Sequence, residues 1–376
     1  MKQEKTDKLT KERSVKIFLA SLKSPKTKED YLRNLDRFRQ YAEFDGFDDF
    51  VLRDSKDIQR LVEDYVLQMR ENEHPNTIPT HYYPIQSFLE MNDVSINFKK
   101  IRRLFPEKKK TAVERGWTTD EVQKMLSITT DLRTRAIIYF ENASGGRIGL
   151  FDELQIKHLH EINDETYGKC YAITGYAESK EEYMTFLTPE ATKALDDYLN
   201  YRKSRGHLLT PDDFVFTGKK TSGNLSTSSK NLGASVVYVA KKAGLRNPLT
   251  KKGSRYPIPT NHGFRHRFNE LLKSSNIVNP HIVEKFLSHK SRLIPLDSVY
   301  FSPNIETMFA EYKKVIPLLT IDPSERLLLE KQDLESENSK LKESKENSEQ
   351  QALEIEKLTK MVERLQKYVI EPSVTD

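Results

Sequence analysis

The sequence has little cysteine and no long apolar run. Its single cysteine, Cys170, excludes an internal disulfide or a cysteine-rich zinc site and suits a reducing, cytoplasmic environment. No apolar run approaches the roughly 20 residues that span a bilayer. The first residues contain no apolar segment typical of a secretory signal. These absences argue against disulfide-rich secreted domains and helical membrane proteins, and we expect no membrane partner.

Signatures of nucleotide and metal binding are also missing. Gly145-Gly146 is not followed by the Lys-Ser/Thr ending of a phosphate-binding loop. Four histidines have no partner at the spacing of metal ligands, namely His158, His160, His207 and His281. We therefore expect neither a metal nor a cofactor.

Charge is plentiful but unevenly distributed. The chain carries 61 Lys and Arg against 56 Asp and Glu, which gives a net charge of +5. From Asp322 onward there are 14 acidic and 9 basic residues, so this tail is net −5 and residues 1–321 carry +10. A basic body favours a polyanionic partner.

Hydrophobic spacing divides the chain into segments. A helical pattern begins at about Val15 and continues to about Asn97, and a basic stretch without a clear period follows it. A capping-box sequence at Thr118 then begins a second domain. We expect a basic arm (1–12), a helical domain (13–97), a basic linker (98–117), a second domain (118–321) and a coiled-coil tail (322–369).

The second domain is expected to be mainly α-helical with a small antiparallel β-sheet, an α+β fold. KCYAITGY (169–176) and EYMTFLT (182–188) flank a polar turn and predict a hairpin. DDFVFTG (212–218) predicts another short strand. Helical patterns occupy most of the remainder.

A seven-residue apolar repeat in the tail predicts a coiled coil, and a second apolar position is present only later, at Leu358 and Leu365. Self-association is the favoured role, with a lone charged helix or docking on another protein as alternatives. The repeated positions are Leu327, Leu334, Leu341, Ser348, Ile355, Val362 and Val369.

The stretch NHGFRHRF (261–268) places two arginines and two histidines among phenylalanines. Helical spacing puts His262, Arg265 and His266 on one face and Phe264 and Phe268 on the opposite, core-facing side. The remaining arginine of the stretch, Arg267, lies on neither face, so we expect it in solvent. Cationic side chains on one face repel each other unless an anion lies between them, and a phosphate is the natural candidate.

Other motifs strengthen this interpretation. GGRIGLFDELQI (145–156) places Arg147 after two glycines, FLSHKS places His289 after an apolar helix, and DSVYFSP presents Tyr300 between turn residues. In this order, with a lysine from the hairpin, the residues resemble the tyrosine recombinases, the integrase family that cuts and rejoins DNA. The resemblance covers about 118–301, and PTNHGFRHRF and EEYMTFLTPE look most like archaeal members.

The resemblance implies a core-binding domain at 13–97, a catalytic domain at 118–321 and a full catalytic set. Tyr300 would be the nucleophile, the two arginines would clamp the phosphate, one histidine would act as base, and the other would donate to a phosphate oxygen. The lysine would protonate the leaving 5′-oxygen. The implied residues are Arg147, Lys180, His262, Arg265, His289 and Tyr300.

The sequence departs from the family pattern in several places. The usual acid position, three residues after the first arginine, is Leu150, so Glu153 becomes the candidate acid after a three-residue insertion. Ser288 stands where the family usually has glycine. Lys169 is the fallback for Lys180. The rival nucleophile is Tyr312, whose spacing from Phe309 is typical of packing.

Two basic segments are expected to contact DNA phosphates, with simple solvation as the alternative. Their residues are Lys99, Lys100, Arg102, Arg103, Lys108, Lys109, Lys110, Lys251, Lys252 and Arg255.

The implied activity is site-specific recombination of double-stranded DNA by four protomers, in the cytoplasm at the nucleoid. The tail and the N-terminal arm favour an integrase or excisionase of an archaeal virus or mobile element. A Xer-like resolvase of chromosome dimers and a non-catalytic DNA-binding coiled-coil scaffold are the alternatives.

Overall fold

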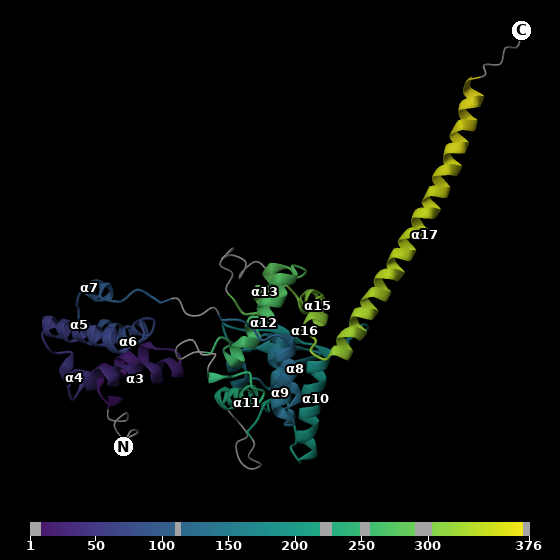
Figure 1. The fold of residues 1–376 in the computed structure, drawn as a ribbon. Helices are drawn as coiled ribbons and strands as arrows, with labels where there is room; N and C mark the ends of the chain where they lie inside the picture. Colours follow the sequence, from purple (N-terminus) through teal and green to yellow (C-terminus); the bar gives the residue numbers. More distant parts are fainter. Residues whose placement is uncertain (1–8, 110–113, 219–227, 249–255, 290–302, 371–376) are drawn as a thin grey trace, which may run out of the picture. The chain divides into compact units, whose positions relative to one another are not determined.

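The computed structural model describes residues 9–109, 114–218, 228–248, 256–289 and 303–370, except for some side chains of the last helix. The chain divides into two compact units, Met1–Thr111 and Ala112–Asp376 (Figure 1). Each unit has a hydrophobic core of its own.

The first unit is helical in its described part. Its helix α3 shows how the sequence specifies such an element: Ser24 accepts a hydrogen bond from the Thr27 amide at 3.4 Å, and Pro25 occupies the first turn. The helices are α2 (Arg13–Ser21), α3 (Pro25–Tyr41), α4 (Phe47–Phe50), α5 (Ser55–Asn72), α6 (Ile78–Met91) and α7 (Phe98–Arg103).

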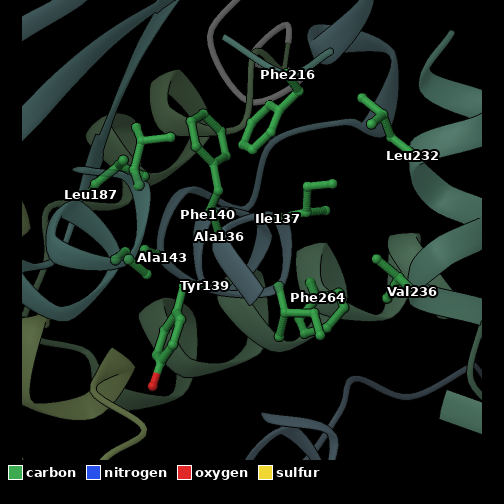
Figure 2. Packing of buried hydrophobic residues seen from close by; sticks show 14 of the residues in the cluster. Ala136, Ile137, Tyr139, Phe140, Ala143, Leu187, Phe216, Leu232, Val236 and Phe264 are labelled. Carbon is green, nitrogen blue, oxygen red and sulfur yellow. The ribbon is translucent and has the colours of Figure 1, made fainter. Parts of the chain in front are cut away.

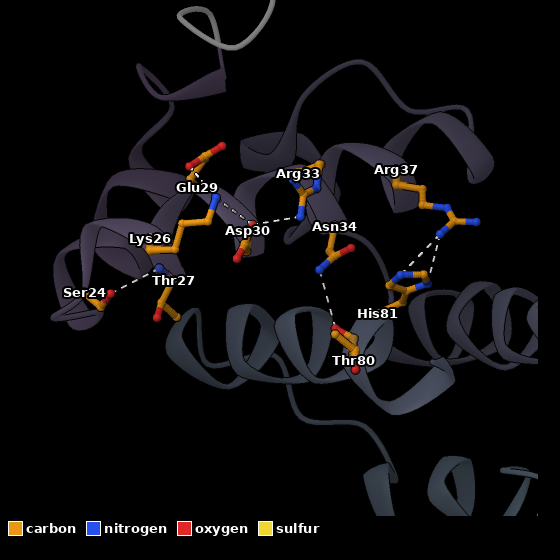
Figure 3. A network of polar contacts seen from close by, with 10 residues as sticks. All are labelled: Ser24, Lys26, Thr27, Glu29, Asp30, Arg33, Asn34, Arg37, Thr80 and His81. Atoms are coloured by element: carbon orange, nitrogen blue, oxygen red, sulfur yellow. Dashed lines mark hydrogen bonds and ion pairs between the residues drawn. The ribbon is translucent and has the colours of Figure 1, made fainter. Parts of the chain in front are cut away.

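Polar contacts join α3 to α6 beside this core (Figure 3). The Asn34 amide donates to the carbonyl of Thr80 at 3.5 Å, and Nη1 of Arg37 lies 2.9 Å from Nδ1 of His81. The apolar side of α3 packs inward through Leu35 and Phe38, both almost fully buried. Apolar packing on one side of α3 and polar contacts beside it therefore hold the two helices together.

The described part of the segment expected to be a linker, 98–117, is folded at both ends. Phe98–Arg103 forms α7, and Ile101 is fully buried in the core of the first unit. At the other end Trp117 is 2% exposed and belongs to the core of the second unit. A short helix whose polar positions are nearly all basic explains why no clear period was visible in the sequence.

The second unit contains a three-stranded antiparallel sheet in the order β1-β2-β3. The predicted hairpin is confirmed as β2 (Gly168–Gly175) and β3 (Tyr183–Leu187). The strand β1 (Leu159–Asp164) was not predicted; it is an edge strand whose side chains are all exposed or only partly buried. DDFVFTG was wrongly predicted as a strand, because only Phe214 forms a single bridge, to Gln155.

Helices pack against strands β2 and β3 of this sheet, so the predicted α+β class is confirmed. The helical elements are α8 (Thr119–Ser127), α9 (Leu132–Ser144), η1 (Ile148–Asp152), η2 (Ile156–His158), α10 (Pro189–Ser204), α11 (Ser229–Lys242), α12 (Thr260–Ser275), α13 (Pro280–Phe286), α15 (Ile305–Lys313), α16 (Ile316–Leu319) and α17 (Pro323–Ile370).

The core of this unit is built around α9, which is buried along most of its length. Phe140 packs edge-on against Phe151 and Phe216, and Ile137 and Phe264 belong to the same cluster (Figure 2). Burial of an aromatic side chain of this kind contributes about 1.5–3 kcal/mol. The core thus fixes α9, which leads into the loop of Arg147, against α12, which carries His262 and Arg265.

The tail forms one 48-residue helix, α17. The apolar repeat residues whose side chains the structure describes are exposed along the helix, including Leu327, Leu334 and Ile355. Leu329, near its start, packs against the core of the second unit. Among the described residues, no helix is long and apolar enough to cross a membrane.

Candidate active site

Arg265 lies at the centre of the candidate site. It lies on α12, directly after the core residue Phe264, and only 4% of it is exposed. Its Nη1 donates to the carbonyl of Gly145 at 3.0 Å, and its Nη2 donates to the carbonyl of Leu287 and lies 2.9 Å from Nε2 of His289. One guanidinium therefore joins the loop after α9 to the end of α13.

Arg147 lies in the loop that follows α9. Gly145 ends α9 in the left-handed conformation at φ 59°, and a Cβ there would lie 2.6 Å from the ring of Phe268. Only glycine fits this turn. Arg147 then precedes η1 and is partly buried. Burial and the charge of Arg147 lower the pKa of Arg265 to about 10, so the two guanidiniums lie in one electrostatic environment.

His289 contacts Arg265 directly. Burial, followed by the charges of Arg265 and Arg147, lowers its pKa, whereas a hydrogen bond to Glu284 opposes that change. The Nδ1–Glu284 Oε2 distance is 2.8 Å. His289 therefore contacts a cation on one ring nitrogen and a carboxylate on the other.

His262 lies one helical turn before Arg265 and is exposed. Its ring packs edge-on against His266, with the centroids 4.7 Å apart. Partial desolvation by the neighbouring side chains lowers the pKa of His262, and the charges of His266, Arg265 and Arg147 act in the same direction. His262 is therefore favoured as a neutral imidazole, the form that can accept a proton.

The β2–β3 turn reaches the same site. The hydroxyl of Ser288, next to His289, donates to the carbonyl of Glu181 at 3.4 Å. Lys180 is exposed in this turn. Lys169, at the other end of β2, makes ion pairs with Asp196 at 2.8 Å and with Glu161 at 3.2 Å. Lys180 is therefore the better placed of the two candidate lysines.

The predicted nucleophile, Tyr300, lies outside the described residues. Its rival Tyr312 is fully buried, and its hydroxyl donates to the carbonyl of Ala143 at 2.8 Å. Burial raises the pKa of Tyr312 well above its ordinary value. Tyr312 is therefore a core residue, in keeping with its packing-type spacing.

The candidate acid and its neighbour differ in their surroundings. Asp152 accepts hydrogen bonds from the amide and hydroxyl of Ser229, at 2.6 and 2.7 Å, and so caps α11. Glu153 is exposed at the end of η1, and its charge acts on Tyr176 near the two arginines. Of the two acids, Glu153 is the one without a capping role in these contacts.

Arg267 was wrongly expected in solvent. It is 4% exposed and donates to Asn142 Oδ1 at 2.9 Å, to the Trp117 carbonyl at 3.2 Å and to Thr119 Oγ1 at 3.0 Å. These partners come from α9 and from the start of α8, which lie more than 120 residues earlier in the chain. Helical spacing within α12 alone could not reveal them.

Sequence reasoning missed Glu284, which holds His289 through the contact described above. Ser288 adopts a left-handed conformation at φ 50° after α13, and such a helix end brings residues five apart together, but a serine does not itself indicate that conformation in the sequence.

The basic residues expected at DNA divide into three groups. Lys100 makes an ion pair with Glu63 at 2.8 Å within the first unit. Lys110, Lys251, Lys252 and Arg255 lie outside the described residues. The other described residues, Lys99, Arg102, Arg103, Lys108 and Lys109, are exposed, as Lys100 also is.

No protein-family model matches the sequence. No curated protein matches it either. Among solved structures, the chain is similar to residues 75–356 of lambda integrase in a dimer bound to a COC′ core site, with a TM-score of 0.50 and 13% identity, over 78% of this chain and 97% of that one.

Two further structures are similar at a TM-score of 0.49. One is the Tn1549 transposon integrase, residues 82–397, in complex with a circular-intermediate DNA, at 14% identity over 80% of this chain and 99% of that chain. The other is the XerH site-specific recombinase in a post-cleavage complex with a palindromic difH substrate, at 15% identity over 77% and 80%. At identities this low, the likeness to lambda integrase is one of fold: a mainly helical chain with a small antiparallel sheet.

Proposed function

We propose that this chain is a tyrosine recombinase, which cuts and rejoins double-stranded DNA through a 3′-phosphotyrosyl intermediate with Tyr300 as nucleophile. The observation that carries the proposal is the position of Arg265. It is buried, it joins the loop of Arg147 to the helix end of His289, and its partners are two carbonyls and an imidazole. A cationic cluster of this composition is stabilised by an anion with several oxygens, such as a DNA phosphate.

In the proposed reaction, Arg147 and Arg265 bind the non-bridging oxygens of the scissile phosphate and stabilise the additional charge of the pentavalent transition state. The Tyr300 oxygen attacks phosphorus, and a P–O bond to tyrosine forms as the P–O5′ bond breaks. A tyrosine has an ordinary pKa near 10, so at neutral pH it needs a base and a cationic environment. The phosphotyrosyl bond conserves the energy of the phosphodiester, so a second 5′-hydroxyl can reverse the step.

Two side chains transfer protons in the proposed reaction, and a third donates a hydrogen bond. His262, favoured as a neutral imidazole, accepts the Tyr300 proton. His289 donates a hydrogen bond to a phosphate oxygen. Lys180, exposed in the turn that contacts Ser288, protonates the leaving 5′-oxygen. Glu153 is the proposed acid near Arg147, and its role is the least constrained by contacts.

The tail supports a finer proposal, self-association through a coiled coil. Five of its repeat residues, Leu327, Leu334, Leu341, Ile355 and Val362, are between 52% and 64% exposed. Apolar side chains at seven-residue spacing are covered when a second helix packs on them. A truncation after Lys331 keeps Leu329 in its core contact and removes most of the repeat. Sedimentation equilibrium is expected to show a smaller assembly for the truncated chain than for the full one.

This tail favours an integrase or excisionase of a mobile element, because a minimal resolvase has no need for it. A Xer-like resolvase remains the alternative with the same chemistry. A non-catalytic scaffold is disfavoured, since it would have no need to keep Arg265 and His289 in contact. Action at a specific DNA site by four protomers is part of the proposal.

The test uses nicked duplexes with a randomised core, so that a cut strand loses its short end and the covalent complex accumulates. Wild-type protein, Tyr300→Phe and Tyr312→Phe are incubated with this pool, and DNA-linked protein is isolated under denaturing conditions. We expect an adduct with wild type and Tyr312→Phe and none with Tyr300→Phe. An adduct that survives Tyr300→Phe and disappears in Tyr312→Phe would overturn the assignment of the nucleophile, and no adduct with any form would refute the activity.

A further inference from the structure

Four side chains form a continuous polar chain beside the candidate site. Arg265 Nη2 lies 2.9 Å from His289 Nε2, and His289 Nδ1 lies 2.8 Å from Glu284 Oε2. The other carboxylate oxygen of Glu284 lies 2.7 Å from Nζ of Lys273. Both oxygens of this carboxylate are therefore engaged, one by a lysine and one by the imidazole.

The order of donors along this row of polar side chains fixes the tautomer of His289. A guanidinium has only donors, so the Nε2 atom that faces Arg265 must accept and carry no hydrogen. In the neutral ring the hydrogen is then on Nδ1, where it is donated to Glu284. Burial alone would raise the pKa of Glu284, but hydrogen bonds from Lys273 and His289 hold it below its ordinary value, so Glu284 is the carboxylate that accepts.

The backbone holds the same pair together a second time. The amide of His289 donates to the carbonyl of Glu284 at 2.9 Å, and the amide of Ser288 donates to the carbonyl of Lys285 at 3.0 Å. These two bonds, with Ser288 left-handed, form the Schellman end of α13. Glu284 thus fixes both the backbone and the ring of His289.

We propose that Glu284 is a positioning residue, which holds His289 as its Nδ1–H tautomer and supplies the negative charge that lets this ring take up a proton when a phosphate binds. The second half rests on the proposed function, whereas the first half does not. On binding, Nε2 takes a proton from solvent and donates it in a hydrogen bond to a phosphate oxygen, while Arg265 turns its Nη2 donor from Nε2 to another oxygen. No covalent bond changes in this step.

The charges around His289 set the sign of the expected effect. Burial comes first and lowers the pKa of His289, Arg265 and Arg147 lower it further, and Glu284 opposes them. Lys273 acts on the ring only through Glu284, whose charge it partly neutralises. Loss of the Glu284 charge is therefore expected to lower the pKa of His289, and loss of the Lys273 charge to raise it.

The first experiment follows the ring nitrogens of His289 by ¹⁵N NMR across a pH titration, without DNA. Wild type, Glu284→Gln, Lys273→Met and the control Glu306→Gln are compared, and His289 is assigned from its loss in His289→Asn. Glu306 is exposed in the first turn of α15. Gln keeps an oxygen that can accept from Nδ1–H, so Glu284→Gln removes the charge and preserves the contact.

We expect the Nδ1–H tautomer in wild type. The titration midpoint should move down by about one pH unit in Glu284→Gln and up in Lys273→Met, with no change in the control. A merely structural role would move both variants in the same direction. An Nε2–H tautomer in wild type, or equal midpoints in all four proteins, would overturn the proposal.

The second experiment measures the pH dependence of adduct formation on nicked DNA. If His289 must be protonated to donate, the alkaline limb follows its pKa, and in Glu284→Gln this limb should lie about one pH unit lower. The rate on that limb would then fall about tenfold. An unchanged limb in Glu284→Gln contradicts the second half of the inference, whereas failure of wild type to form a Tyr300-dependent adduct contradicts the proposed function and leaves the NMR result to decide the first half.

Discussion

Substitution of Arg267 by methionine provides a sharp test of the structural account of α12. Arg267 is 4% exposed and bonds to Asn142, Trp117 and Thr119. Methionine fills part of the volume but leaves all three acceptors without a donor. The opposite prediction follows from helical spacing alone, which would place this arginine in solvent and make its replacement harmless.

Two effects of this substitution oppose each other. Burial lowers the pKa of Arg267 to about 10 from 12.5, which corresponds to roughly 3 kcal/mol of desolvation that methionine would relieve. Two of the acceptors are buried and Thr119 Oγ1 is partly buried, and an unsatisfied buried acceptor costs about 1–3 kcal/mol, so the three together cost about 3–7 kcal/mol. At the middle of that range the loss of the bonds exceeds the relief, and we expect a net destabilisation of about 2 kcal/mol.

Urea unfolding followed by tryptophan fluorescence measures this change directly. Trp117 is the only tryptophan of the chain and is buried beside Arg267, so its emission reports the second unit. The matched control is Arg205→Met, at an exposed position after α10, for which a change within about 0.5 kcal/mol is expected. A loss below about 1 kcal/mol for Arg267→Met would refute the assignment of Arg267 as a buried structural anchor.

Three other predictions concern the site, the fold and the DNA contacts. Lys180→Ala is expected to slow adduct formation roughly 100- to 10,000-fold, whereas Lys169→Ala should mainly reduce stability, because its ion pairs lie within the fold; equal rate losses would contradict this. Burial raises the pKa of Glu190 to about 7, so the folded state binds the extra proton and stability should fall by about 3 kcal/mol as pH rises from 4.5 to 7; Glu190→Gln should flatten that dependence in urea titrations. The double variant Lys99→Ala, Lys108→Ala should reduce the slope of log affinity against log salt by about 2, and an unchanged slope would place both lysines away from phosphates.

Local periodicity was sufficient for the elements whose burial follows their own sequence. The apolar face of α12 was predicted, and Phe264 and Phe268 are fully buried. The hairpin β2–β3 was predicted from two apolar runs and a polar turn. In both cases the residues that decide the structure lie within one turn or two strands of each other, so short-range spacing carries the information.

What the sequence could not provide depends on partners that are distant in the chain. β1 pairs with β2 through its backbone, and its charged side chains give no strand pattern. Arg267 is buried because it donates hydrogen bonds to acceptors on α8 and α9. The sequence around residue 267 does not predict these contacts, because both acceptors are distant in the chain. The proximity of Arg147, Arg265 and His289 was expected only from family resemblance. In the structure, the Arg265 guanidinium bonds to the loop after α9 and to the end of α13, next to His289.

The nature of those bonds also explains how the site can keep a buried positive charge available for a ligand. Several arginines nearer the surface pair directly with carboxylates, as Arg115 does with Glu121 at 2.7 Å. Among the described residues, the partners of Arg265 are carbonyls and an imidazole, which satisfy its donors without neutralising its charge. The nearest carboxylate in its polar chain, Glu284, reaches it only through His289 and is itself paired with Lys273. A phosphate would therefore meet an uncompensated cation and would not have to displace a carboxylate, whose removal from a buried pair costs several kcal/mol.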